Sequence, residues 1–325
     1  MGGRLATELQ EVSSDPAVLE DGQFWTVVVS FEGEMTFARF GKVLESKFPH
    51  SHWQKLDSPW TSSSTEDEYI QYVNSVREEI AQGSVYQVNA CYELRNKLSD
   101  QVPHLAGLFT ELLQENPAPF AQYLRIPGLE FASASPERLL SVDQGKVLTS
   151  PIKGTIRESD AIFGEKDKAE NLMIVDLMRN DLGQICSHGS IEVTDLFRTE
   201  KHPGLTHLVS DVAGQLGDGI TWREILGAIS PAGSVSGAPK SSAVSTIAHH
   251  EKFNRKIYCG ALGWVQEERA ELAVGIRTFW KGEDNVLRFG TGAGITWGSD
   301  ARSEWAETQL KARKLISIAG GEWRE

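Results

Sequence analysis

The order of the apolar segments constrains the fold of this chain more than any other feature of its sequence. Short apolar runs that suit strands come in groups, and longer runs with helical spacing lie between the groups rather than after each strand. A doubly wound parallel sheet needs a helix after each strand, whereas antiparallel strands need only turns. The sequence therefore predicts an α+β fold with antiparallel sheets.

Periodicity and breaker residues assign the expected elements. Thr65 and Glu68 have the spacing of a capping box, and Gly83 ends the helix that begins there. We also expect helices at 166–182, 222–229 and 303–319. Strands are expected at 24–31, 85–89, 139–142, 191–197, 258–266, 272–280 and 286–289. A loop at 58–64 separates a short N-terminal region, 1–64, which belongs to the same body, from a main domain at 65–325.

Charge and composition disfavour several classes of protein. The formal net charge of -13 argues against nucleic acid or anionic membrane as a partner, because both need a basic face. No segment reaches the roughly 20 apolar residues of a membrane span, and the N-terminus has no apolar signal core. The 3 cysteines are far apart and lack CxxC spacing, which predicts neither a disulfide framework nor a zinc site. We therefore expect a soluble cytoplasmic protein.

Two glycine-rich segments are similar to nucleotide-binding loops but have the wrong spacing. The segment Gly233–Ser241 lacks both the four-residue gap between glycines and the lysine directly after the second glycine. In Gly290–Gly294 the third glycine comes one place early for a dinucleotide fingerprint. The second segment predicts either a close approach of the backbone to a small molecule or a tight turn or bulge.

Two pairs of acids lie one helical turn apart on expected helices. They are Asp167 with Glu170, and Glu304 with Glu307, and Lys311 follows one turn later. Residues at these separations share a helix face. If the two faces meet, their carboxylates would surround a hard divalent cation such as Mg²⁺. Each pair taken alone also fits a solvated face with ordinary ion pairs.

Four further residues are single candidates for chemistry. Lys153 lies between a proline-led segment and a glycine, and a buried amine beside other cations has a lowered pKa and can act as a nucleophile. A partly buried Glu137 can keep its proton and act as a general acid. Arg277 and His207 are candidates for holding an anion. The plain alternative is that all four are structural or surface residues.

Taken together and in this order, these segments resemble the chorismate-utilising enzymes, a family that includes anthranilate, aminodeoxychorismate, isochorismate and salicylate synthases. The matching motifs are SPERLL (135–140), PIKGT (151–155), AENLMIVDLMRNDLG (169–183), HPGLTHLVSDVAGQL (202–216), PAGSVSGAPK (231–240), YCGALGW (258–264), GIRT (275–278), GTGAGI (290–295) and SEWAETQLKA (303–312). The resemblance runs from about Thr65 to the C-terminus. It implies two antiparallel sheets packed in a sandwich and surrounded by helices. It makes the main domain a chorismate-binding catalytic domain.

The resemblance also implies a role for each matched residue. Glu170 and Glu307 would bind Mg²⁺ directly, and Asp167 and Glu304 would reach the ion through water. The residues that would contact the substrate are Thr155, His207, Ser234, Tyr258, Arg277, Gly292, Gly294 and Lys311.

Two positions separate the members of the family. Members that add water carry a lysine base where this chain has Gln87, so the resemblance disfavours them. Anthranilate synthases carry alanine where this chain has Lys153, whereas aminodeoxychorismate synthases carry lysine. The resemblance then implies that Lys153 attacks C2 of chorismate, that Glu137 protonates the departing 4-hydroxyl, and that ammonia adds at C4. A separate glutamine amidotransferase subunit would supply the ammonia. Amination at C2 and a non-catalytic binding subunit are the alternatives.

Overall fold

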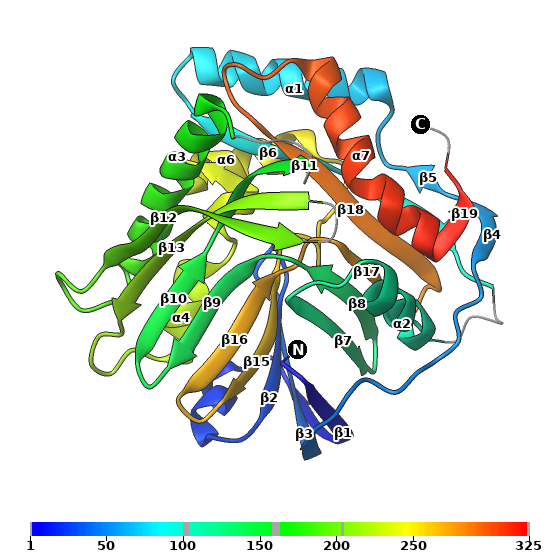
Figure 1. The fold of residues 1–325 in the computed structure, drawn as a ribbon, viewed down its shortest axis with the longest axis vertical. Helices are drawn as coiled ribbons and strands as arrows, with labels where there is room; N and C mark the ends of the chain where they lie inside the picture. Colours follow the sequence, from blue (N-terminus) through cyan, green and yellow to red (C-terminus); the bar gives the residue numbers. More distant parts are fainter. Residues whose placement is uncertain (1, 100–103, 158–162, 203–204, 324–325) are drawn as a thin grey trace.

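A computed structural model of the 325-residue chain describes residues 2–99, 104–157, 163–202 and 205–323. Within these ranges the side chains of residues 155–157, 166, 202 and 205 are not described. Two large antiparallel sheets form the centre, and helices lie around them (Figure 1). The α+β class expected from the sequence is confirmed.

The larger sheet has ten strands and includes the N-terminal residues. Its order is β1-β3-β2-β15-β16-β9-β10-β13-β11, and β12 pairs with β13. The strands are β1 (Arg4–Ser13), β2 (Trp25–Val29), β3 (Met35–Glu45), β9 (Arg138–Asp143), β10 (Lys146–Ser150), β11 (Ile152–Arg157), β12 (Glu192–His202), β13 (Leu205–Gln215), β15 (Ala261–Gln266) and β16 (Arg269–Val274). The hairpin of β15 and β16 therefore joins the N-terminal strands to β9.

The second sheet has seven strands in the order β14-β6-β18-β17-β8-β7, with β5 paired to β6. The strands are β5 (Thr61–Ser62), β6 (Gln87–Lys97), β7 (Phe120–Ile126), β8 (Leu129–Ser135), β14 (Gly237–Ala238), β17 (Thr278–Lys281) and β18 (Val286–Ile295). β6 and β18 pair without interruption from Val286 opposite Lys97 to Ile295 opposite Val88. A small parallel pair consists of β4 (Leu56–Pro59) and β19 (Gly320–Glu322).

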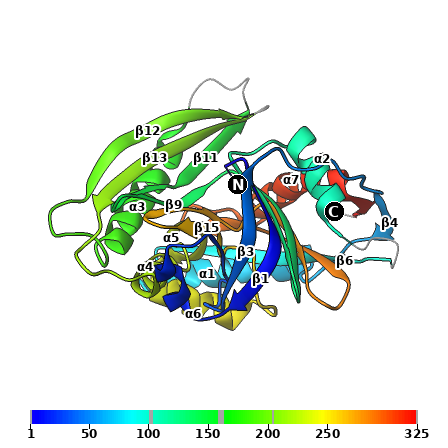
Figure 2. The same cartoon turned by 90° about the horizontal axis from the view of Figure 1, so that it is seen from below.

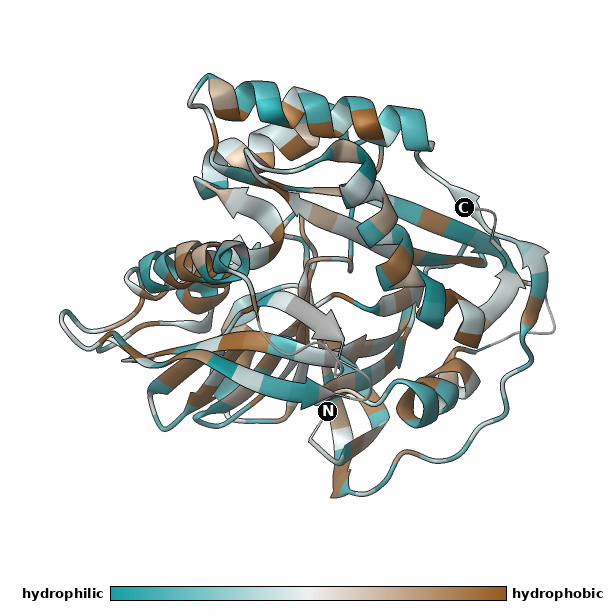
Figure 3. Ribbon diagram, turned by 45° about the horizontal axis from the view of Figure 1, so that its top comes forward, coloured by the Kyte–Doolittle hydropathy of each residue, from teal (hydrophilic) through white to brown (hydrophobic). Residues whose placement is uncertain are grey.

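The helices cover the sheets with their apolar faces. They are the 3₁₀ helix η1 (Pro16–Asp21), α1 (Glu66–Ala81), α2 (Ala106–Glu115), α3 (Glu165–Leu182), α4 (Trp222–Ile229), α5 (Gly233–Ser236), α6 (Lys240–His250) and α7 (Ala301–Ala319). α7 contacts β18 and α1, and α3 contacts β11 and β13 (Figures 1 and 2). Hydrophilic and hydrophobic bands alternate along these helices (Figure 3), as expected for amphipathic elements. In the described ranges, no helix combines the length and apolarity of a membrane span.

Most expected elements are present close to their expected positions. The helices at 166–182, 222–229 and 303–319 are α3, α4 and α7. The capping box of α1 is confirmed, because the Glu68 amide donates to Thr65 Oγ1 at 3.3 Å and the Thr65 amide donates to Glu68 Oε2 at 2.9 Å. The strands expected near 24–31, 85–89, 139–142 and 191–197 are β2, β6, β9 and β12.

The strand expected at 272–280 is wrong as a single element. Its residues are divided between β16 and β17, which belong to different sheets. The connecting residues Gly275–Arg277 redirect the chain, and Arg277 takes up a left-handed conformation with φ of 52°. Similarly, the strand expected at 258–266 begins only at Ala261, because Cys259 has φ of 63°.

Two loop assignments also change. The expected loop at 58–64 includes the end of β4 and all of β5, because its backbone pairs with β19 and β6. The strand expected at 286–289 continues to Ile295, so the segment Gly290–Gly294 lies inside a central strand rather than in a turn. Its glycines consequently place bare backbone beside neighbouring side chains.

Candidate active site

Lys153 lies on β11 among four other charged side chains. The pairing of β11 with β13 shifts register between Ile152 and Thr155, and Gly154 within this irregularity has φ of 89°. The charges of Glu137, Glu170, Glu307 and Lys311 all act on the Lys153 amine. We call these five residues the lysine–carboxylate cluster. It brings together groups from β11, α3, α7 and the turn before β9.

The Lys153 amine has a lowered pKa. Burial is the largest cause, and the neighbouring Lys311 ammonium lowers the pKa of Lys153 further. The three carboxylates of the cluster oppose this shift without cancelling it. A lowered pKa increases the fraction of neutral amine at neutral pH, and only the neutral amine is a nucleophile.

Glu137 is buried, with 4% of its surface exposed. Burial raises the pKa of Glu137 to about 7, although three neighbours favour its ionised form. Those neighbours are the Ser234 hydroxyl and the Ile152 backbone amide, which donate hydrogen bonds, and the charge of Lys153. A carboxyl group that titrates near neutral pH can give a proton to a leaving group. Ser234, expected only as a substrate contact, therefore also contacts the candidate acid.

The two acidic pairs reach the cluster from different helices. On α3, Asp167 Oδ2 accepts a hydrogen bond from the Gly164 amide at 2.9 Å, and Glu170 is half-buried. On α7, Glu304 is buried, whereas Glu307 is exposed and accepts from Lys311 Nζ at 2.7 Å. Both Glu170 and Glu307 lie near enough to Lys153 to influence its charge. One acid from each helix therefore lies near Lys153.

The donor chemistry of these acids fits Mg²⁺. In the part of the chain that the structure describes, no three His, Cys, Asp or Glu side chains are gathered as a complete protein cage. Mg²⁺ commonly takes only one or two protein carboxylates and completes its shell with water and an anionic ligand. Glu170 and Glu307 offer two such carboxylates from separate helices. The site therefore suits an ion that binds together with its substrate.

The glycines of β18 leave room beside the cluster. A Cβ atom added to Gly294 would lie 2.9 Å from both Gln87 Nε2 and Lys153 Nζ, so these two nitrogens approach one point above β18. Gln87 is fully buried, and neither amide atom of its side chain has a hydrogen-bond partner. A buried amide without a partner is costly. The Gln87 amide therefore offers an unused donor and an unused acceptor beside Lys153, which the sequence did not reveal.

Tyr258 and Lys311 approach the same strand. A Cβ atom at Gly290 would lie 2.2 Å from the Tyr258 ring, so only glycine fits there. The Cys91 thiol donates to the Tyr258 hydroxyl at 3.7 Å. Lys311 Nζ donates to the Gly292 carbonyl at 3.2 Å and thereby connects α7 to β18. These contacts gather the candidate substrate contacts of β18 and α7 on one side of the cluster.

The remaining candidates lie on neighbouring elements. Arg277 is half-buried, and its charge interacts with Tyr258. His207 is buried on β13 and pairs by backbone register with Thr155. The side chain of Thr155 lies outside the described residues. The structure thus places the backbone of Thr155 beside His207 and two residues from Lys153.

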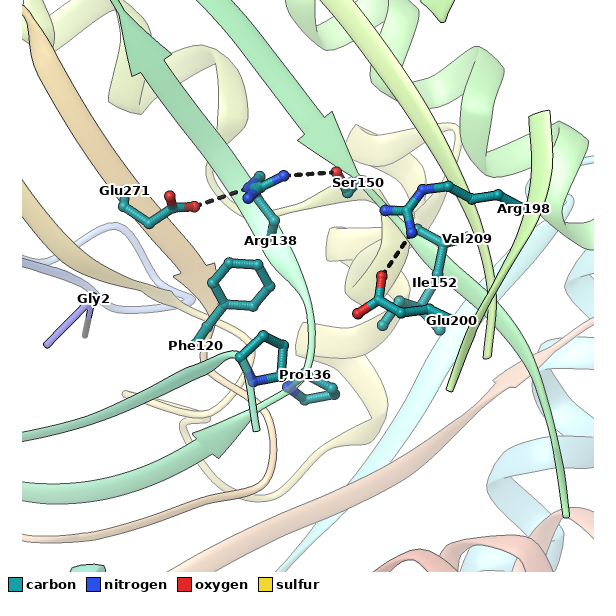
Figure 4. Close-up of a pocket in the computed structure, with 11 residues that line it drawn as sticks. Gly2, Phe120, Pro136, Arg138, Ser150, Ile152, Arg198, Glu200, Val209 and Glu271 are labelled. Carbon is teal, nitrogen blue, oxygen red and sulfur yellow. Dashed lines mark hydrogen bonds and ion pairs between the residues drawn. The ribbon is translucent and has the colours of Figure 1, made fainter. Parts of the chain in front are cut away.

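A pocket of about 350 Å³ is lined by sequence neighbours of the catalytic candidates and not by Glu137 or Lys153 themselves. Its lining includes Pro136, Arg138 and Ile152, which flank Glu137 and Lys153 in the sequence (Figure 4). Ile152 lines this pocket, whereas Lys153 belongs to the cluster. The candidate site is therefore the cluster, and the pocket is a separate feature.

Comparisons with known proteins agree on one family. Residues 20–317 match the family model of the chorismate binding enzyme. Anthranilate synthase component 1 of Aquifex aeolicus (strain VF5) is 35% identical over 270 residues, covering 79% of this chain and 54% of that protein. Aminodeoxychorismate synthase component 1 of Escherichia coli (strain K12) is 32% identical over 314 residues, covering 93% and 68%. The chain spans about half the length of the anthranilate synthase relatives that it matches.

Solved structures share the fold. Anthranilate synthase component I from Streptococcus pneumoniae TIGR4 has 24% identity and a TM-score of 0.79, with 90% of this chain and 80% of that chain covered. The menaquinone-specific isochorismate synthase from Escherichia coli has 18% identity and a TM-score of 0.80, with 97% and 85% covered.

Proposed function

The chain belongs to the family of chorismate binding enzymes, and from this premise we propose that it aminates chorismate at C4 to give 4-amino-4-deoxychorismate, a step towards p-aminobenzoate and folate. The observation that carries this choice is Lys153. Its amine has a pKa lowered by burial and lies beside Glu137, which titrates at about 7. The lowered pKa favours the neutral, nucleophilic form of the Lys153 amine, and a carboxyl that can act as an acid lies beside it.

Binding of the substrate would use both helix faces and the glycine strand. Glu170 and Glu307 would hold Mg²⁺, and Asp167 and Glu304 would support it through water. The bound ion would withdraw electron density from the substrate carboxylate. The side chains and backbone that would orient the carboxylates of chorismate are Thr155, His207, Tyr258, Arg277, Gly292, Gly294 and Lys311.

The reaction would proceed through a covalent adduct. The neutral amine of Lys153 attacks C2, both conjugated ring double bonds shift, and the C4–O bond breaks as Glu137 protonates the departing hydroxyl, which leaves as water. The new secondary amine gives its surplus proton to the Glu137 carboxylate. Ammonia then attacks C4, both double bonds shift back, and the C2–N bond breaks. Glu137 returns the proton to Lys153 as it leaves.

The ammonia would come from a separate glutamine amidotransferase subunit. The relatives in both aminating groups are named component 1, which implies a second component for them. We expect the isolated chain to use ammonium salt but not glutamine. Glutamine-dependent turnover by the pure chain would contradict the two-subunit arrangement.

Amination at C2, which yields anthranilate, is the second candidate. It is favoured by relatives named anthranilate synthase component 1, which reach 36% identity. The two functions differ at Lys153, because without a nucleophile at that place ammonia attacks C2 directly. Incubation of the chain with chorismate, Mg²⁺ and ammonium salt decides between them. We expect the 4-amino product by chromatography and mass, and anthranilate as the main product would overturn the proposal.

Lys153→Ala tests the covalent mechanism. We expect loss of most 4-amino product while chorismate still binds, with a small amount of anthranilate because C2 is now open to ammonia. Lys153→Arg should give no rescue, since a guanidinium stays protonated. Circular dichroism establishes that both variants fold. Formation of the 4-amino product by Lys153→Ala at the wild-type rate would rule out the adduct.

A further inference from the structure

A buried ion pair lies beneath the candidate site. Arg255 and Glu251 expose only 1% and 2% of their side chains. Arg255 Nε donates to Glu251 Oε2 at 2.8 Å, and Arg255 Nη2 donates to Glu251 Oε1 at 2.6 Å. Taking two charges out of water is costly unless further hydrogen bonds satisfy their remaining donors and acceptors. The partners of those remaining groups therefore indicate what the pair does.

The remaining bonds go to backbone groups of two other elements. Arg255 Nη1 donates to the Val235 carbonyl of α5 at 3.0 Å, and Arg255 Nη2 also donates to the Asn89 carbonyl of β6 at 2.6 Å. Glu251 Oε1 accepts from the Cys91 amide of β6 at 3.0 Å. The pair consequently fixes α5, β6 and the end of α6 to one another.

Each fixed backbone carries a candidate site residue close by. Val235 follows Ser234, whose hydroxyl bonds to Glu137. Asn89 lies two residues from Gln87 and on the same face of β6. In the part of the chain that the structure describes, the Val235 carbonyl accepts from Asn89 Nδ2 at 3.1 Å as well as from Arg255 Nη1. Arg255 is therefore one of the groups that fix the backbone next to Ser234, together with the pairing of β14 with β6.

We propose that Glu251 and Arg255 form a positioning pair that holds α5 so that the Ser234 hydroxyl stays on the Glu137 carboxylate. The proposal rests on the proposed function in one respect, that Glu137 is the proton donor of the reaction. A purely structural pair would affect folding and leave the titration of Glu137 unchanged. A positioning pair affects that titration through Ser234.

The direction of the effect follows from the hydrogen bond. Because the Ser234 bond favours the ionised form of Glu137, losing it raises the pKa of Glu137 further. The reaction needs the protonated acid, so the high-pH limb of kcat moves upward. A hydrogen bond of ordinary strength corresponds to a shift of roughly 0.5 to 1 pH unit.

Arg255→Lys is the first variant, because an ammonium keeps the charge but lacks the planar fork that reaches two carbonyls. We expect kcat to fall about tenfold or more through misplacement, with KM changed less than about twofold, and the high-pH limb to shift upward. The second variant combines Glu251→Leu with Arg255→Met. It leaves no unpaired buried charge, so we expect it to fold even if Arg255→Lys does not. It should show the same shift. If neither variant folds, the pair is needed for the fold itself and the proposal is wrong.

A double-mutant cycle with Ser234→Ala distinguishes a positioning pair from a purely structural pair. Ser234→Ala alone should shift the limb, and adding Arg255→Lys should shift it no further, because both changes remove the same bond. Additive shifts, or an unmoved limb in folded Arg255→Lys, would overturn the proposal. The matched control is Lys281→Met with Glu130→Leu, a buried pair on β17 and β8 with its atoms 3.5 Å apart. The control should lower thermal stability and leave the limb in place.

The same assays distinguish this inference from the proposed function. If the wild-type product is anthranilate, the proposed function fails, but the departing hydroxyl still takes a proton and the limb still reports on Glu137. If the 4-amino product forms and the limb does not respond to Arg255, only the positioning proposal fails.

Discussion

The two sides of the candidate site differ in regularity. The lysine side consists of β11 and α3, and the glycine side consists of β6, β18 and α7 (Figure 1). On the lysine side the strand register shifts beside Lys153, and the residue that precedes α3 is Gly164, which offers no side chain as a cap. On the glycine side β6 and β18 pair over ten consecutive positions, and Asp300 caps α7 by accepting from the Ser303 amide at 2.9 Å.

This difference in strand regularity fits the roles that the two sides would have in the proposed reaction. An irregular strand can re-aim a side chain out of the usual alternation, which is what a nucleophile beside a ligand requires. A regular pair of strands holds its backbone still, and its glycines let a ligand approach. In the proposed reaction the nucleophile would therefore lie on the irregular side, and the backbone that holds the substrate would lie on the regular side.

The largest expected effect tests whether the irregular side also binds metal. Glu170→Ala should reduce kcat by about a thousandfold, because a metal ion supplies several kcal/mol of charge stabilisation. A chelator should have a similar effect on the wild type. Glu165→Ala on the same helix is the control, since Glu165 is exposed and forms a surface ion pair with Lys168 at 2.9 Å. Full turnover of Glu170→Ala, or of the wild type in excess chelator, would contradict the metal assignment.

The next effect concerns the acid between the two sides. Burial raises the pKa of Glu137 from 4.5 to about 7. A raised pKa means that the folded state holds the proton more tightly. The contribution of protonated Glu137 to the free energy of unfolding is therefore fully present below pH 4.5. It is lost as pH rises to about 7, and the ionised carboxylate then costs about 3 kcal/mol of stability.

Glu137→Gln removes that cost. The variant should be more stable than the wild type by about 3 kcal/mol at pH 8, with the difference vanishing near pH 4, and it should be inactive. Urea unfolding at the two pH values measures this. Glu283→Gln, at an exposed position, is the control. Equal stability of Glu137→Gln and the wild type at pH 8 would mean that the carboxyl is not desolvated as described.

The smallest effect compares one glycine from each side. Gly154→Ala should lose about 1–2 kcal/mol of stability, because its φ of 89° is strained for any residue with a Cβ. Gly294→Ala should lose less stability, since its Cβ meets only the flexible ends of Gln87 and Lys153, yet it should lose activity. Gly298→Ala, with open space around it, is the control for both. A fully active Gly294→Ala would show that the space above β18 is not used.

The sequence predicted those elements whose signals are local. The capping box of α1 and the periodicity of α4 and α7 depend on neighbouring residues, and the structure confirms them. The division at Gly275–Arg277 was not predictable, because arginine rarely takes a positive φ and the run is otherwise apolar. Tertiary contacts determine the backbone conformation at positions such as Arg277.

The candidate site shows the same limit. The acids of α3 and α7 were found from their one-turn spacing, which survives in the structure. The pair Glu251 and Arg255 was missed because an acid and a base four residues apart usually lie on a solvated helix face. Its burial depends on α5 and β6, which are far away in the sequence. Likewise, the orphaned amide of Gln87 is visible only when its surroundings are known.

The strand order also determines how the chain folds during its synthesis. β2 pairs with β15, and β9 pairs with β16, so the hairpin at 261–274 is the link between the first strands and the rest of the larger sheet. Until the ribosome has made that hairpin, β2 presents an open edge with unpaired amides and carbonyls. At about 5–20 residues per second this takes roughly ten seconds or more. The edge of β2 that pairs with β15 consequently stays open until a segment more than 200 residues later in the sequence has been made.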